Sequence, residues 1–211
     1  MNHAPITIIL LAITCIISYL AFNNESLSRK LIMNPYIVAR RKEYYRFISS
    51  GFIHSGIVHL LFNMITFYSF AQYVEFHFRF EHGQLLGGIY FIALYIGGII
   101  VSDIPTYLNY KNLPHYNSLG ASGGVSSVLF ASILYEPLTP LYVFGVIPMF
   151  SFIMGAVFLV YSYYFAKGSD DNINHSAHFF GALFGFIFAI AVEPLALIGF
   201  FEKIAAWKMG F

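Results

Sequence analysis

Six long apolar stretches separate the polar parts of this 211-residue chain, and they constrain its fold more than any other feature. They cover residues 5–22, 56–76, 85–101, 119–135, 148–166 and 177–192. Each approaches the ~20 residues with which an α-helix crosses a ~30 Å hydrocarbon core. Only 10% of the residues are charged, against about 25% in soluble domains. The sequence therefore predicts an all-α integral membrane protein, with six transmembrane helices in one domain over residues 1–211.

The segments outside these stretches carry further predictions. Residues 23–51 are polar and basic and are expected to form a long loop, whose cluster Arg40, Arg41 and Lys42 faces water or lipid headgroups. Pro148 is expected to open the fifth helix, because proline fits the first helical turn. Residues 194–211 are expected to form a short amphipathic helix at the interface. Five further prolines are expected in or beside the connections between helices: Pro105, Pro114, Pro137, Pro140 and Pro194.

Charge and cysteine content exclude some classes of protein. The net charge of +1 provides no basic surface for a nucleic-acid partner. The single cysteine, Cys15, lies in the first apolar stretch and has no partner for an internal disulfide. No basic segment precedes that stretch and no small-residue cleavage site follows it, so we expect a retained span rather than a signal peptide.

Three of the predicted helices carry polar side chains, which are costly in a bilayer. In the second, His59 and Asn63 are four residues apart and project from one face. His54 lies five residues earlier, just ahead of the helix. The fourth stretch contains Gly-Ala-Ser-Gly-Gly, with Ser122 at its centre, and the sixth has His178 at its start.

Glycines spaced by four accompany the serine and the last histidine. They are Gly120 and Gly124 on the fourth stretch, and Gly181 and Gly185 on the sixth. Such a face of small residues lets another helix approach closely. The two faces are therefore expected to bring the serine within hydrogen-bond reach of the histidine.

That arrangement has a chemical interpretation. A serine hydroxyl becomes a good nucleophile when a neighbouring base takes its proton, so Ser122 would attack and His178 would be the base. The oxyanion of the tetrahedral intermediate needs hydrogen-bond donors. His59, Asn63 and the Ser122 N–H, which has no partner within its helix, would supply them.

Each feature also has a structural interpretation, and sequence spacing alone leaves both open. Glycines around a serine commonly serve helix packing, and His59 and Asn63 can hydrogen-bond between helices. Histidines also recur at a spacing of five, as His54 with His59 and His77 with His82. A zinc helix of the HExxH type instead spaces its histidines by four, and no HExxH occurs. No metal is expected.

Together these residues resemble the rhomboid family of intramembrane serine proteases, over about Glu43 to Gly185 plus the preceding span. The family's GxSG motif corresponds to Gly120, Ala121, Ser122 and Gly123. Its HxxxxHxxxN motif corresponds to His54, His59 and Asn63, and its AHxxGxxxG motif to Ala177, His178, Gly181 and Gly185. In the first loop Tyr45 and Arg46 stand where the family has Trp-Arg. Each motif is weak alone, but three in the right order are specific.

The resemblance implies a six-helix bundle with a long, partly embedded first loop, and a Ser122–His178 dyad that needs no cofactor and no third acid. Consistent with this, no carboxylate is expected on the spans facing the serine. Asp170 and Asp171, shortly before the histidine, are the only rivals for a third member and are expected in a loop.

Structural support is implied for a further set of residues: His54, Arg46, Glu75, Gly120, Gly181 and Gly185. Of these, Glu75 matches a family glutamate that helps anchor the first loop. Ala71 and Arg79 replace glycines that often flank it. Ser126 replaces an aromatic residue that often stacks on the catalytic histidine, so another aromatic side chain of the spans is expected to hold His178.

The implied reaction is hydrolysis of a peptide bond in or beside a transmembrane segment of another protein. The expected partners are therefore transmembrane protein substrates and membrane lipids, with no nucleic acid and no metal. The polar segment 167–174 is expected to act as a mobile cap over the site. The alternative is a catalytically inactive relative of the same fold that binds transmembrane segments without cutting them.

Membrane orientation presents a conflict. The resemblance implies a bacterial inner-membrane protein with both termini in the cytoplasm and the site on the outer side. Most of the basic residues would then lie outside, in the first loop and near the site, against the tendency of cytoplasmic loops to be basic.

Overall fold

Helices make up most of the part of the chain that the structure describes. The computed structural model describes residues 4–143, 146–166 and 173–207. Its long helices are α1 (Pro5–Phe22), α5 (Ile57–His82), α6 (Gln84–Tyr110), α7 (Ser122–Tyr135), α8 (Ser151–Phe165), α9 (His175–Val192) and α10 (Leu195–Ala206). The first loop contains α2 (Glu25–Leu31), α3 (Pro35–Arg41), α4 (Arg46–Ser49) and a 3-10 turn, η1 (Ser50–Phe52). A short antiparallel hairpin joins α7 to α8, formed by β1 (Pro140–Val143) and β2 (Ile147–Phe150).

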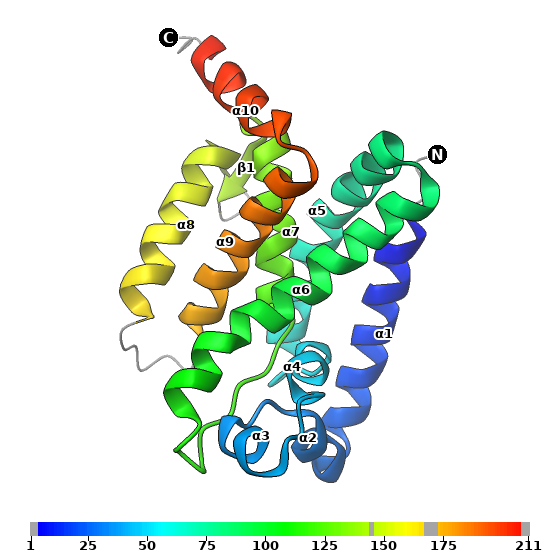
Figure 1. Cartoon of the computed structure of the whole chain (residues 1–211), viewed down its shortest axis with the longest axis vertical. Coiled ribbons are helices and arrows are strands. Elements are labelled where there is room, and N and C mark those ends of the chain that lie inside the picture. Colours follow the sequence, from blue (N-terminus) through cyan, green and yellow to red (C-terminus); the bar gives the residue numbers. More distant parts are fainter. Residues whose placement is uncertain (1–3, 144–145, 167–172, 208–211) are drawn as a thin grey trace.

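The predicted class of helical membrane protein is confirmed. Among the described residues, four helices, α1, α5, α6 and α9, are long and apolar enough to cross a membrane, whereas the apolar helices α7 and α8 are shorter, with 14 and 15 residues. Twelve of the 14 residues of α7 are buried, because α5, α6 and α9 pack around it. The loop helices α2, α3 and α4 gather at the end of the molecule opposite α10 (Figure 1).

Several predicted boundaries were wrong. Helix α6 continues to Tyr110, nine residues beyond the expected end, and holds Pro105 inside it. Its polar residues Ser102 and Asp103 are buried against other helices rather than marking the membrane surface. Pro148 lies in β2 and does not open α8, which begins at Ser151. The basic segment expected as a loop contains short helices, whereas the helix expected in the tail is confirmed as α10 (Leu195–Ala206).

Glycines bring the helices around α7 into backbone contact. A Cβ atom on Gly181 would collide with the main chain of Gly123, and one on Gly185 with the main chain of Ser127. The expected pairing of glycine faces was thus partly wrong. Gly120 precedes α7, and Gly124 faces Tyr95 on α6 instead of α9.

Glu75 holds the start of α1 rather than the first loop, which corrects the expected role. Its carboxylate is fully buried and accepts hydrogen bonds from the backbone N–H groups of Ile6 (3.1 Å) and Thr7 (2.7 Å), and from Arg79 Nη1 (2.9 Å). The reason is distance, since twelve residues of helix separate Glu75 from Asn63, about 18 Å at 1.5 Å per residue. A carboxylate at a helix N-terminus satisfies its free N–H groups.

Candidate functional site

Ser122 is the first residue of α7, and the turn before it is held from two sides. The Gly120 N–H donates to the Ser50 carbonyl (3.0 Å), and the Ala121 N–H donates to His54 Nε2 (3.3 Å). Gly120 has a φ of 121°, a conformation that favours glycine. A Cβ there would also lie 2.7 Å from Cε1 of His59. The turn therefore requires glycine for its backbone shape and for the imidazole packed on it.

His54 connects this turn to α1. Its Nδ1 lies 2.9 Å from Ser18 Oγ, which in turn donates to the Phe52 carbonyl (3.0 Å). Because Nε2 accepts from Ala121, the proton of the neutral ring belongs on Nδ1, where it donates to Ser18. The side chain is 4% exposed. Burial, with a smaller contribution from His59, lowers the pKa of His54 from 6.5 to about 3.

We expect this histidine to make the fold sensitive to acid. The unfolded chain takes up a proton on His54 below pH ~6.5, whereas the folded chain resists it, so stability is fully present above that pH and falls as the pH falls. The slope is up to about 1.4 kcal/mol per pH unit for one proton. Thermal unfolding of the detergent-solubilised protein between neutral and mildly acidic pH measures it. His54→Ala should flatten the dependence, and the same change at exposed His115 should leave it intact. An unchanged slope in His54→Ala would contradict the expectation.

The predicted oxyanion donors lie on the first turns of α5. The His59 ring packs on Gly120, and its Nδ1 lies 3.1 Å from Ser55 Oγ, which leaves the Nε2 edge toward the serine turn. Asn63 is 7% exposed, and its Nδ2 donates to the His59 carbonyl (3.0 Å). The structure thus brings His59 to the turn that precedes Ser122, with Asn63 one helical turn behind it.

His178 lies in the first turn of α9, which packs beside the start of α7 through Gly181 and Gly123. The expected aromatic partner of His178 is Phe158 of α8, whose ring stacks with its centroid 5.8 Å away and an interplanar angle of 26°. The His175 ring lies edge-on to the His178 ring, and the two ring centroids are 5.9 Å apart. The aromatic side chain that replaces the one absent at Ser126 therefore comes from α8.

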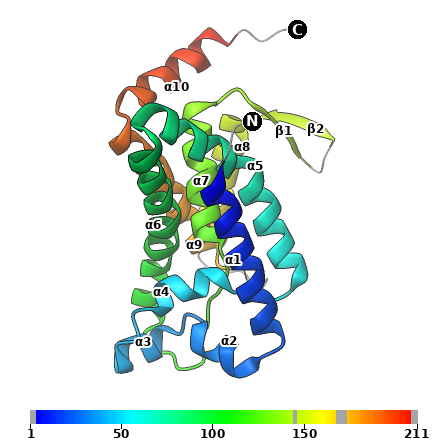
Figure 2. The same cartoon turned by 90° about the vertical axis from the view of Figure 1, so that its right-hand side faces the viewer.

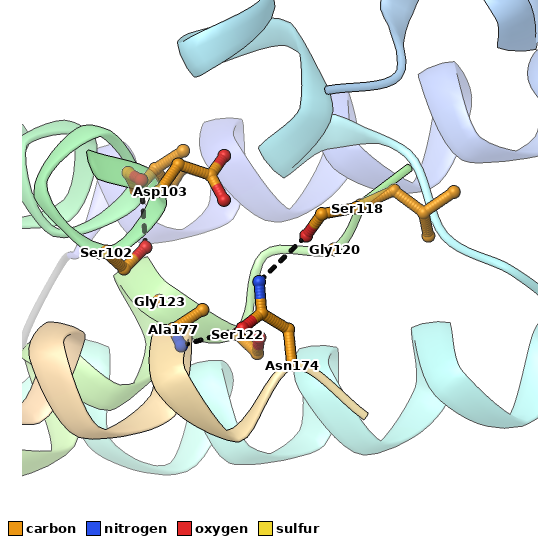
Figure 3. Close-up of a pocket in the computed structure, with 10 residues that line it drawn as sticks. Ser102, Asp103, Ser118, Gly120, Ser122, Gly123, Asn174 and Ala177 are labelled. Carbon is orange, nitrogen blue, oxygen red and sulfur yellow. Dashed lines mark hydrogen bonds between the residues drawn. The ribbon is translucent and has the colours of Figure 1, made fainter. Parts of the chain in front are cut away.

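A small cavity lies beside Ser122 (Figure 3). Its volume is about 10 Å³, near the room that one water molecule needs. The polar residues that line it with the serine come from α6, from the segment before α7 and from the start of α9: Ser102, Asp103, Ser118 and Asn174. The site can therefore hold a water molecule among several hydrogen-bonding groups.

Asn174, which the sequence interpretation missed, joins three of these elements. Its Oδ1 caps α9 by accepting from the Ala177 N–H (3.0 Å), and its Nδ2 donates to Thr106 Oγ1 (2.9 Å) and Ser118 Oγ (3.0 Å). Asparagine three residues before the first apolar turn is a helix N-cap signal, which could have identified it. Residues 167–172 of the expected cap 167–174, Asp170 and Asp171 among them, lie outside the described residues.

Asp103 contradicts the expectation that no carboxylate of the spans faces Ser122. It is 6% exposed, lines the cavity with Ser122, and accepts a hydrogen bond from Ser50 Oγ (3.2 Å). Ser50 is the same residue whose carbonyl holds Gly120. Asp103 was missed because the third stretch was taken to end at residue 101. The helical spacing of Ser102, Asp103 and Thr106 could have revealed the polar face.

Arg46 organises the first loop. It is 4% exposed, its Nε donates to Glu43 (2.7 Å), and its Nη1 donates to the carbonyls of Arg29 (2.9 Å) and Ile32 (2.7 Å) at the end of α2. The hydrogen bond from Arg46 lowers the pKa of the Glu43 carboxyl. Tyr45 donates through its hydroxyl to the Lys30 carbonyl (3.1 Å). These hydrogen bonds hold α4 against α2. Helix α4 leads directly into η1, where the Ser50 carbonyl accepts from Gly120.

Comparison with known proteins gives a consistent result. The family model described as Rhomboid domain matches residues 41–194. YdcA of Bacillus subtilis (strain 168) is 29% identical over 151 residues, 69% of this chain and 65% of its own length. Rhomboid protease GluP of the same organism is 28% identical over 76% of this chain and 28% of its own length. The human presenilin-associated rhomboid-like protein, mitochondrial, is 29% identical over 64% of this chain and 35% of its own. The chain thus spans less than two thirds of the length of each of these relatives.

Proposed function

Because this chain belongs to the rhomboid family and is an integral membrane protein, we propose that it is a serine endopeptidase that cuts other membrane proteins in or beside their transmembrane segments. The observation that carries the proposal is the convergence at the start of α7. Ser122 lies at a helix N-terminus, on a glycine turn covered by His59, beside the first turn of α9 that holds His178. Relatives named as rhomboid proteases support it.

The proposed mechanism uses two covalent steps. His178 removes the proton of Ser122 as Oγ attacks the scissile carbonyl carbon, and a tetrahedral intermediate forms. His178 then returns that proton to the leaving amine, and the C–N bond breaks to give an acyl-enzyme. A water molecule, held in the cavity beside Ser122, attacks the ester while His178 acts again as base. His178 then returns the proton taken from water to Ser122 Oγ as the ester C–O bond breaks, which releases the new carboxyl end and restores the serine.

Stabilisation of the oxyanion is assigned to α5 and α7. The Ser122 N–H belongs to the first turn of α7 and lies outside the helical ladder, and the His59 Nε2 edge faces the same turn. Asn63 completes the set from one turn further along. Asp103 and His54 act on the turn through Ser50 and Ala121, so both are positioning residues in this scheme.

The substrate is proposed to be a transmembrane segment that unwinds locally. An intact helix hides its carbonyls in backbone hydrogen bonds, so helix-weakening residues near the cut favour reaction. To test this, the full chain is reconstituted in vesicles with a panel of single-span proteins, and fragments are read by mass spectrometry. Cleavage that disappears in Ser122→Ala supports the proposal. Binding of the same segments without any cleavage would instead favour the inactive membrane-segment binder.

Removing an oxyanion donor should slow turnover strongly without unfolding the chain. Loss of one such donor typically costs 10²–10³ in rate, so we expect reductions of about that size for His59→Ala and for Asn63→Ala. Cleavage rates on one substrate, with thermal unfolding measured in parallel, provide the check. Val58→Ala, at an exposed position of the same turn, is the matched control. Parental rates in both variants would remove α5 from the site.

We also propose the family orientation, in a bacterial inner membrane with both termini cytoplasmic. The start of α1 and α10 lie toward the same end of the molecule, which fits an even number of crossings (Figure 1). A reporter fused after Phe211 tests the orientation. A periplasmic signal from that fusion would reverse it.

A further inference from the structure

An apolar groove lies between α1 and the first-loop helices, away from Ser122. It is lined by Ile17, Leu31, Tyr45, Ile48, Ser49 and Phe52, and its volume is about 320 Å³. That size falls at the lower end of small-ligand pockets, ~300–1,000 Å³. Figure 2 shows α1 running down onto α2, with α4 beside them. No part of the proposed proteolysis uses this groove.

The polar atoms of the groove are already satisfied by protein partners. Ser49 Oγ donates to the Leu31 carbonyl (2.8 Å), and the Tyr45 hydroxyl donates to the Lys30 carbonyl (3.1 Å). The surface that remains is hydrocarbon, so a polar ligand would lose its own hydrogen bonds with water and gain none. The same two hydrogen bonds join the walls of the groove, so the groove is already formed before a ligand binds. The chemistry of the lining therefore selects an acyl chain.

The groove is continuous with surface that meets lipid. On α1, a candidate membrane span, Ile16 is 59% exposed and Leu20 is 51% exposed, on either side of the groove residue Ile17. A lipid chain can therefore enter from the bilayer without crossing water.

The charge around the groove selects the headgroup. Residues 23–56 contain six Lys and Arg and two Glu, a net charge of +4. Both Glu side chains are occupied, Glu25 by Arg29 and Glu43 by Arg46. Lys30 is exposed, directly precedes Leu31 of the groove, and makes no ion pair among the described residues. A cation at this place attracts an anionic phospholipid headgroup.

We propose that this groove binds one anionic phospholipid, with an acyl chain between α1 and α4 and the phosphate near Lys30. Bilayer lipid is as apolar as the groove, so burying the chain gives no preference of its own. The preference for an anionic lipid comes from the basic residues of the loop. The bound lipid joins α1 to the loop that carries Arg46 and His54.

Photolabelling tests the proposal without relying on proteolysis. The full chain, in phosphatidylcholine vesicles, receives phosphatidylglycerol or phosphatidylcholine with a diazirine in the acyl chain, and labelled peptides are mapped by mass spectrometry. Label should concentrate on the groove residues. The phosphatidylglycerol label there should exceed the phosphatidylcholine label about five-fold, the ratio expected for one cation beside an anionic headgroup.

Matched variants separate the two parts of the proposal. Ile48→Trp fills the groove and should remove most of the label there, whereas Ile65→Trp, on an exposed face of α5, should not. Lys30→Gln should reduce the preference for phosphatidylglycerol about five-fold, and Lys111→Gln should keep it. Groove label no greater than that around Ile65 in the parental protein, which needs no variant to fold, would overturn the lipid site. Equal label from the two lipids would overturn the anionic preference of the site. Absence of any lipid label in the groove would also overturn the proposal, and would favour a protein segment as its occupant.

Discussion

Ser122→Ala is expected to abolish both proteolysis and labelling by a fluorophosphonate probe, and this is the largest effect we predict. The probe reacts with a serine whose proton a base has taken, and the dyad works as a unit. Loss of either member should therefore lower the rate by roughly 10⁴–10⁶-fold, so His178→Ala should fall nearly as far. The measurement is gel-based labelling of the reconstituted chain, with the labelled peptide identified by mass spectrometry.

Ser126 and Ser127 are internal controls on the same helix. Both are buried, and Ser127 Oγ already donates to the Gly124 carbonyl (2.7 Å) and lies 3.0 Å from the Leu94 carbonyl. Their replacement by alanine should leave labelling in place. Asp170→Asn and Asp171→Asn should also keep most of it, because no third acid is proposed. Strong labelling of Ser122→Ala, or none of the folded parental chain, would remove the protease assignment and favour the inactive binder.

Gly181→Ala should reduce stability and activity together, which is the second large effect. The added Cβ would collide with the backbone of Gly123, the residue after Ser122, and would lie 2.9 Å from the Cα of Gly123. Backbone atoms cannot move aside as a flexible side chain can, so α9 must shift away from α7 and carry His178 with it. Overpacking of this kind typically costs 1–3 kcal/mol. Gly181→Leu should be more severe.

The matched control is Gly199→Ala on α10, where a Cβ would meet nothing within 4 Å. In a helix this change alone favours folding by about 1 kcal/mol, so the two variants should differ in sign. Thermal unfolding and cleavage rate, measured on both, provide the comparison. A Gly181→Ala chain as stable and active as Gly199→Ala would mean that α9 does not pack on α7 as described.

Much of the fold was predictable from hydropathy, because lipid-facing and buried helices both need apolar side chains. The limits of α1 were predicted correctly. The end of α6 was not, because Ser102 and Asp103 satisfy their polar groups inside the protein, whereas the expected end assumed water there. The hairpin around Pro148 was missed for a related reason, since its residues are as apolar as the helix that follows.

Some residues of the candidate site were likewise predictable from the sequence, whereas others were not. Motif spacing predicted Ser122, His59 and His178 as site residues, and the structure places His59 and the first turn of α9 close to the start of α7. Partners supplied by distant segments could not be read from spacing, as in the contact of Ser18 with His54, 36 residues away, or of Phe158 with His178. For Glu75 the residue was predictable from its motif, but its interaction partners were not. Its motif position was recognisable, yet its partners lie on α1 rather than on the first loop.

The hydrogen bond between Ser18 and His54 has a consequence for dissecting this protein into parts. The family domain matched here begins at residue 41, so a chain trimmed to it would lose α1. His54 would then have no acceptor for its Nδ1 proton and would be free to turn away from the Ala121 N–H. The first helix thus helps to hold the turn that precedes Ser122, and we expect the smallest unit that folds on its own to be longer than the sequence-defined domain.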